Sequence, residues 1–217
     1  MPRSLIRWAH RLLLEHYGRP AWEARNEPLD ELIGTVLSQH TSDVNAARAF
    51  AGLKAAFDSW EQVRDAPAAE LEQAIRRGGL AVVKASRIQA ILHALTNTAG
   101  IVELPDPGRM RRSRARALLT KLPGVGTKTA SCVLLFGAGV PAIPVDTHVH
   151  RVSLRLGLVP PKSTPDATTD VLEAAIPPKD HFAFHVNLIR HGREVCKAQR
   201  PRCGICVLRT HCNLYNS

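Results

Sequence analysis

The segment LPGVGTKTA, residues 122–130, joins two helical stretches through a turn rich in glycine. Between residues 107 and 128 the chain carries seven Lys and Arg residues and no acid. Such a turn lets bare backbone N–H groups approach an anion, and the N-terminus of the next helix adds partial positive charge. The segment therefore predicts a hairpin that holds a DNA phosphate without reading base sequence. The alternative is an ordinary helical hairpin with a solvated basic face.

Helical patterns flank this hairpin on both sides, and Gly or Pro residues separate them. Asp43 and Asp146 are the expected N-caps of two of these helices. The longest β-like stretch, residues 140–145, contains two prolines, which argue against a central strand. The sequence therefore predicts an all-α fold. The expected helices cover approximately residues 2–16, 28–37, 43–57, 68–76, 88–95, 111–120, 127–136, 146–156, 167–175 and 181–191.

The chain of 217 residues has a formal net charge of +10 and a pI of about 10.0. A surface this basic favours a polyanionic partner, either nucleic acid or an anionic membrane. The sequence contains no run of roughly 18 or more apolar residues, and its N-terminus is typical of an amphipathic helix rather than a signal peptide. We therefore expect a DNA partner, no membrane association and a cytoplasmic location, with the protein on the nucleoid through DNA binding.

Four of the five cysteines lie in the last 22 residues, with the spacing Cys196-x6-Cys203-x2-Cys206-x5-Cys212. Four thiolates on short loops can hold either a tetrahedral zinc ion or a [4Fe–4S] cluster, and the residues alone favour neither. A disulfide pair is the remaining alternative. The fifth cysteine, Cys132, lies in an apolar helix and is expected in the core.

LPGVGTKTA resembles the helix–hairpin–helix of the endonuclease III family of DNA glycosylases. Eighteen residues after Lys128, the segment VDTHVHR, residues 145–151, resembles the family segment that carries the catalytic aspartate. The resemblance implies that Lys128 attacks the sugar and forms a Schiff base, and that Asp146 stabilises positive charge there. Taken singly, Lys128 is also consistent with a solvated surface lysine and Asp146 with a simple N-cap.

The cysteine spacing, together with HGREVC at residues 191–196, is similar to the cluster loop of the same family. This likeness favours a [4Fe–4S] cluster held by Cys196, Cys203, Cys206 and Cys212. Cluster ligation would fix three cations within the loop on one surface, where DNA phosphates could meet them. These cations are Lys197, Arg200 and Arg202.

Further DNA contacts follow from the family resemblance. Gly124, Gly126 and Thr127 would lie at the phosphate. A polar residue after the second helix would help to fill the space left by a flipped base, and the candidates are Gln39 and His40. Leu80, in a Gly-Leu turn similar to that of the family, would wedge between bases.

These features predict a two-lobed protein. Residues 21–140 would form a six-helix domain with the helix–hairpin–helix, and residues 1–20 plus 141–217 would form the iron–sulfur domain. Duplex DNA with a damaged base or abasic site would lie between them, with Lys128 and Asp146 facing each other, on a monomeric protein.

The predicted function is a bifunctional glycosylase and AP lyase of base excision repair that removes oxidised pyrimidines. One alternative is a monofunctional mismatch or adenine glycosylase. Lys128 argues against it. We also expect no separate carboxylate in the second helix to act as general acid, because Val36 or a neighbour would hold that place. The other alternative is a non-catalytic DNA-binding relative.

Overall fold

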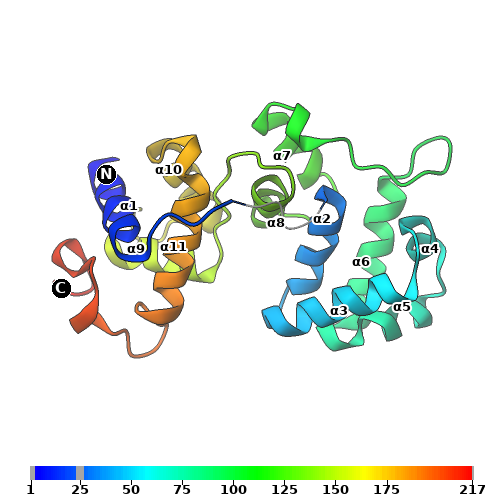
Figure 1. Cartoon of the computed structure of the whole chain (residues 1–217), viewed down its shortest axis with the longest axis horizontal. Coiled ribbons are helices and arrows are strands. Elements are labelled where there is room, and N and C mark those ends of the chain that lie inside the picture. Colours follow the sequence, from blue (N-terminus) through cyan, green and yellow to red (C-terminus); the bar gives the residue numbers. More distant parts are fainter. Residues whose placement is uncertain (1–2, 23–26, 217) are drawn as a thin grey trace. The chain divides into compact units, whose positions relative to one another are not determined.

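The computed structural model describes residues 3–22 and 27–216 (Figure 1). Regular structure in these ranges is helical, and the β pairing in them is limited to one isolated antiparallel bridge between Thr96 and Val102. The predicted all-α fold is therefore confirmed. No described helix combines the length and hydropathy that a membrane span requires.

The chain divides into two compact units. The continuous unit comprises residues 24–140, and the discontinuous unit comprises residues 1–23 and 141–217.

Helix α2 (Pro28–Ser38) is the central element of the continuous unit. Leu32, Ile33, Val36 and Leu37 on it are fully buried. Proline at its first position supplies a preset helical φ where no N–H partner is needed. It packs against α3 (Asp43–Ala56), α6 (Ala81–Ala94), α8 (Thr127–Cys132) and the π-helical turn η3 (Val133–Gly137).

The remaining helices of this unit are α4 (Trp60–Asp65), α5 (Ala68–Ile75) and α7 (Arg112–Thr120), with 3₁₀ turns η1 (Arg76–Gly78) and η2 (Pro107–Arg109). The sequence analysis did not predict α4, which has only six residues and buries one apolar side chain, Val63. So short a helix has no hydrophobic periodicity to read.

Three details of the expected helices were wrong. The helix expected over residues 88–95 begins earlier, at Ala81. Ser42, not Asp43, caps α3, because its hydroxyl accepts a hydrogen bond from the Asn45 N–H at 3.3 Å and Asp43 is already helical. The helix after the hairpin was expected to run to residue 136 as one α-helix. It changes to a π turn at Val133, where the backbone accommodates α2 packed against it.

The discontinuous unit contains α1 (Arg3–Tyr17), α9 (Thr147–Leu156), α10 (Pro165–Ala175) and α11 (His181–Glu194). Helix α1 packs against α10 and α11, so the N-terminal helix completes a core built from the C-terminal part of the chain. The cysteine tail follows as two 3₁₀ turns, η5 (Cys203–Ile205) and η6 (Arg209–His211).

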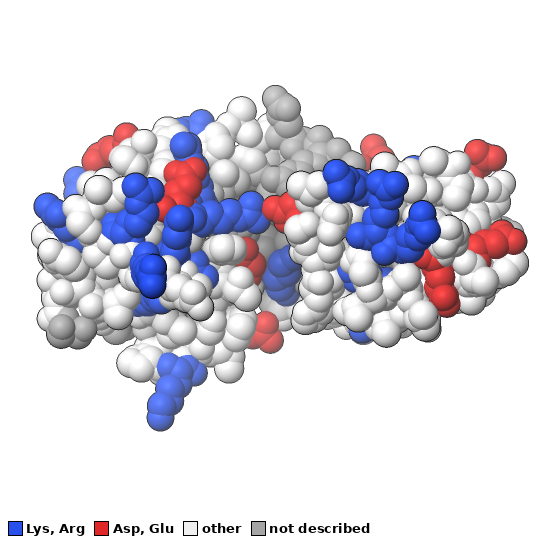
Figure 2. All heavy atoms as spheres, turned by 90° about the horizontal axis from the view of Figure 1, so that it is seen from below, with Lys and Arg blue, Asp and Glu red and all other residues white. Residues whose placement is uncertain are grey.

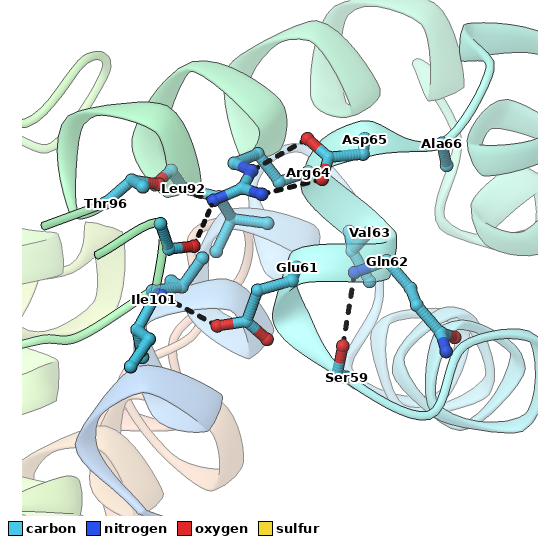
Figure 3. A network of polar contacts seen from close by, with 12 residues as sticks. Ser59, Glu61, Gln62, Val63, Arg64, Asp65, Ala66, Leu92, Thr96 and Ile101 are labelled. Atoms are coloured by element: carbon cyan, nitrogen blue, oxygen red, sulfur yellow. Dashed lines mark hydrogen bonds and ion pairs between the residues drawn. The ribbon is translucent and has the colours of Figure 1, made fainter. Parts of the chain in front are cut away.

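Polar contacts attach the short helix α4 to its surroundings (Figure 3). Outside the helix, the Arg64 guanidinium donates to the Gly100 carbonyl at 2.8 Å. Within the helix it also donates to both carboxylate oxygens of Asp65, at 2.8 and 2.6 Å, which fixes its orientation. The Gln89 amide, on α6, donates to the carbonyls of Arg64 at 3.1 Å and Ala66 at 2.8 Å. These bonds replace the apolar contacts that so short a helix lacks.

Replacing Gln89 with Met should lower the free energy of unfolding by about 1–2 kcal/mol, because carbonyls at the end of α4 lose their donor while side-chain volume is kept. Urea unfolding followed by circular dichroism measures this change. Ser86→Ala, at an exposed position of the same helix, is the control and should unfold as the unaltered protein does. Equal midpoints for both variants would show that the Gln89 bonds contribute nothing.

Candidate functional site

The hairpin that precedes α8 requires glycine at residue 124. Gly124 has a φ of +69°, and a Cβ added there would collide with the Arg87 guanidinium. The Arg87 guanidinium, from α6, therefore packs directly on the bare backbone of the turn. Gly126 differs, since a Cβ there would meet no atom within 4 Å. The hairpin is thus supported on one side by Arg87 and open at Gly126, as an approaching anion requires.

Lys128 is the second residue of α8, immediately after this hairpin. Its side chain is half-buried, whereas Thr129, Ala130, Ser131 and Cys132 are buried. No side chain caps the start of the helix, so its first N–H groups stay directed outward. Lys128 therefore lies where the buried part of α8 meets solvent, and it is only partly covered.

The two candidate polar residues after α2 have different settings. The Gln39 amide oxygen accepts a hydrogen bond from Arg87 at 2.6 Å, and its nitrogen lies 3.5 Å from the Thr129 hydroxyl. His40 is exposed and has a left-handed φ of +54°. Gln39 therefore joins the loop to the hairpin, while His40 is displayed to solvent.

Leu80 lies on a second left-handed turn, between η1 and α6. Its φ is +50°, and its side chain is 57% exposed. Val82 and Val83 follow with 64% and 52% exposure. Apolar side chains this exposed contribute little to the stability of the fold. Packing at the end of the preceding helix therefore does not account for a leucine at residue 80.

Asp146 is the N-cap of α9, as expected. Its Oδ1 accepts a hydrogen bond from the Val149 N–H at 2.8 Å. The cap fixes the carboxylate at the helix N-terminus and leaves Oδ2 for charge or proton chemistry. Asp146 belongs to the discontinuous unit and Lys128 to the continuous unit, and their approach across a cleft stays a prediction.

The four cysteines of the tail influence one another electrostatically. Burial, with a further contribution from the other three cysteines, raises the pKa of the Cys206 thiol to about 11. Neighbouring thiols that are wholly or partly buried ionise more readily where a positive centre compensates their charge, as metal ligation does. The donor set therefore fits a resident metal centre.

The donor types by themselves fit two kinds of centre. The four ligands of zinc converge on one ion, whereas each ligand of a [4Fe–4S] cluster binds a different iron atom. Four cysteine thiolates can serve either centre.

Neighbouring side chains hold the cysteine loop in place. Arg155 donates to the carbonyls of Lys197 at 2.7 Å and Ala198 at 2.8 Å, and its Nη1 lies 3.6 Å from the Cys196 sulfur. His191 lies 3.4 Å from the Cys206 sulfur. Hydrogen bonds of this kind orient metal ligands and tune the centre they bind.

The expected DNA-facing cations of the loop are all exposed, namely Lys197, Arg200 and Arg202. On the face shown in Figure 2, Lys and Arg side chains outnumber Asp and Glu. Sequence reasoning missed two residues near the loops, Arg87 and the buried Lys84. Neither carried a signal, because each resembles an ordinary helix-surface cation until its contacts are known.

Purified protein should contain roughly four iron and four sulfide per chain and no stoichiometric zinc, as expected for a cube. Cys203→Ala should lose most of this iron, because a cluster with three thiolate ligands is less stable. Metal analysis and visible absorption measure both. Cys132→Ala, outside the tail, serves as control and should keep full iron content. About one zinc per chain would contradict the cluster assignment.

Comparison with known proteins identifies the family of this chain. Residues 33–178 match the HhH-GPD superfamily of base excision DNA repair proteins, and residues 196–212 match the iron–sulfur binding domain of endonuclease III. The chain is 37% identical to endonuclease III of Thermotoga maritima, covering 90% of this chain and 87% of that protein. It is 36% identical to endonuclease III of Bacillus subtilis, with 86% and 81% covered.

Among solved structures, the chain is similar to a non-covalent endonuclease III–DNA complex, with a TM-score of 0.85, 32% identity and 100% and 97% of the two chains covered. A trapped endonuclease III–DNA covalent intermediate has the same TM-score and identity, with 100% and 98% covered.

Proposed function

The chain belongs to the endonuclease III family within the HhH-GPD superfamily of base excision DNA repair proteins, and from this we propose how its own residues act. The protein is a bifunctional DNA glycosylase and AP lyase. It removes damaged bases, of which oxidised pyrimidines are the expected class, and then cleaves the strand at the abasic site. It carries a [4Fe–4S] cluster in the tail.

Lys128 at the start of α8 is the observation that carries this proposal. Its neutral amine attacks C1′ of the flipped nucleotide, and the C1′–N bond breaks with its electron pair leaving on the base. The base takes up a proton, and the sugar ring opens to a protonated Schiff base on Lys128. Loss of a C2′ proton then expels the 3′ phosphate, which is β-elimination. Hydrolysis of the Schiff base returns the amine.

Asp146 supplies the complementary charge. Its carboxylate, fixed by the α9 cap, stabilises the positive charge that develops on the sugar and relays protons during ring opening. This role requires Asp146 and Lys128 to face each other in the DNA complex.

The remaining site residues bind and open the duplex. The hairpin at Gly124 and Gly126, with Thr127, holds a phosphate, and the exposed cations of the tail meet others. Leu80 inserts between bases, and His40 is the better placed of the two polar candidates to reach DNA, because Gln39 is already bonded to Arg87. The cluster orders the tail and takes no part in the bond changes. The protein acts as a monomer.

The alternative of a monofunctional glycosylase requires a separate general acid. The expectation that the second helix contains no separate carboxylate was wrong, because α2 contains the buried Glu31. Its Oε1 accepts a hydrogen bond from Thr35 at 3.4 Å, and its Cβ packs beside Gly137 of the π turn. These contacts give Glu31 a structural role, and Lys128 favours the lyase.

Borohydride should trap a covalent adduct between the protein and a duplex containing thymine glycol or an abasic site, because it reduces the Schiff base. Lys128→Ala should form no adduct and should lose at least about 10³-fold in strand cleavage, since no amine replaces the nucleophile. Gel electrophoresis of labelled DNA measures both. Lys121→Ala, in the preceding turn, is the control. No adduct from an iron-loaded protein that binds the duplex would reject the lyase and favour the monofunctional or non-catalytic relative.

Asp146→Asn separates charge from capping, because asparagine caps helices as well as aspartate does. Thermal stability should stay within about 0.5 kcal/mol of the unaltered protein while excision of thymine glycol falls by about 10²-fold or more. Differential scanning fluorimetry and single-turnover kinetics provide the two readouts. Full activity in Asp146→Asn would show that the residue is only a cap.

A further inference from the structure

Lys84 of α6 is a buried cation bonded to two backbone carbonyls. The residue is only 2% exposed. Its Nζ donates to the carbonyl oxygens of Leu37 at 2.7 Å and of Gly78 at 2.8 Å. Burial lowers the pKa of this ammonium. Burying such a group has a substantial desolvation cost, which its hydrogen bonds must offset. A contact retained at this cost needs an explanation.

The two carbonyls stand at the bases of the two loops expected to enter DNA. Leu37 is in the last turn of α2, two residues before Gln39 and three before His40. Gly78 ends η1, two residues before Leu80. The last carbonyls of a helix have no partner within it, so each would otherwise need another donor. One ammonium, with three N–H donors, satisfies both.

The backbone around this contact is close-packed and strained. A Cβ added at Gly78 would lie 3.0 Å from the Ala49 Cβ, so the turn is pressed against α3. Beyond it, Gly79 and Leu80 have left-handed φ values of +67° and +50°, and His40 has +54°. Left-handed non-glycine residues persist only where their surroundings hold them.

Lys84 holds the Leu80 turn from two sides. Its backbone N–H donates to the Leu80 carbonyl at 3.0 Å, as the first turn of α6 requires, while its side chain bonds the carbonyl of Gly78. The same side chain reaches Leu37. Displacement of either loop would therefore stretch one of the two hydrogen bonds that the Lys84 ammonium makes.

We propose that Lys84 is a positioning residue that fixes the spacing of the His40 loop and the Leu80 turn, so that both enter the duplex together around a flipped nucleotide. This inference rests on the proposed function. Lys84 touches neither substrate nor reacting atoms, and acts only through the two loops. It matters most when a paired base must be unstacked, and least when the base is already absent.

The test compares Lys84→Met with Gln89→Met. Both changes keep side-chain volume, both lie on α6, and both remove donors to backbone carbonyls, but those of Gln89 belong to α4, not to the loops. Single-turnover rates are measured on a thymine glycol duplex and on an abasic duplex, at a temperature where all variants are folded by circular dichroism. Fluorescence of 2-aminopurine beside the lesion reports unstacking independently of chemistry.

Lys84→Met should slow thymine glycol excision about tenfold, slow cleavage of the abasic duplex no more than about twofold, and reduce the 2-aminopurine signal. Gln89→Met should change neither of the two rates, nor the 2-aminopurine signal, by more than about twofold. The double variant Lys84→Met plus Leu80→Ala should excise thymine glycol only slightly more slowly than Leu80→Ala alone. The effects of two substitutions do not add when the residues act as one unit.

Equal effects of Lys84→Met and Gln89→Met, or full additivity with Leu80→Ala, would overturn the inference. If Lys84→Met does not fold, Lys84→Gln, which keeps a shorter donor, is judged by the same criteria. An unaltered protein that forms no borohydride adduct would instead reject the proposed function, which is a separate result.

Discussion

Burial of α2 is the constraint on which the arrangement of the continuous unit depends. Leu32, Ile33, Val36 and Leu37 are removed from water completely, and each such side chain contributes about 1.5–3 kcal/mol. To cover them, α3, α6, α8 and the π turn must all pack on this one helix. The loop after α2, the turn before α6 and the hairpin before α8 are then brought close together, although they are far apart in sequence.

Buried polar contacts fix the loops, whose positions the packing of the helices does not determine. Apolar packing sets the positions of helices, but the loops between them bury too little to be held by it. Lys84 bonds the bases of two loops, and Arg87 joins Gln39 to the hairpin glycine. A nucleophile and an inserting side chain must be held to a fraction of an ångström, which directional bonds achieve.

The cysteine tail of the discontinuous unit is held in place in a different way. Its tail has two single-turn 3₁₀ segments with no buried residue in either, and its apolar anchor is Leu208 between them, which is fully buried in the core of this unit. Bonds from Arg155 to the carbonyls of Lys197 and Ala198 add to this limited apolar contact. Metal ligation is coupled to folding in loops of this kind, so a cluster bound by the tail would also order the exposed cations on it.

The sequence by itself determined the helical class, the hairpin, the Asp146 cap and the cysteine donor set, because each follows from local spacing: glycines at a turn, an acid before a helix, thiols on one short loop. It did not indicate α4, the π turn, or the roles of Lys84 and Arg87. Only the tertiary structure decided these. The bonds from Lys84 to Leu37, from Arg87 to Gln39 and from Gln89 to Ala66 span 47, 48 and 23 positions, and the π turn packs against the distant α2. No local pattern encodes which carbonyl a distant lysine will reach.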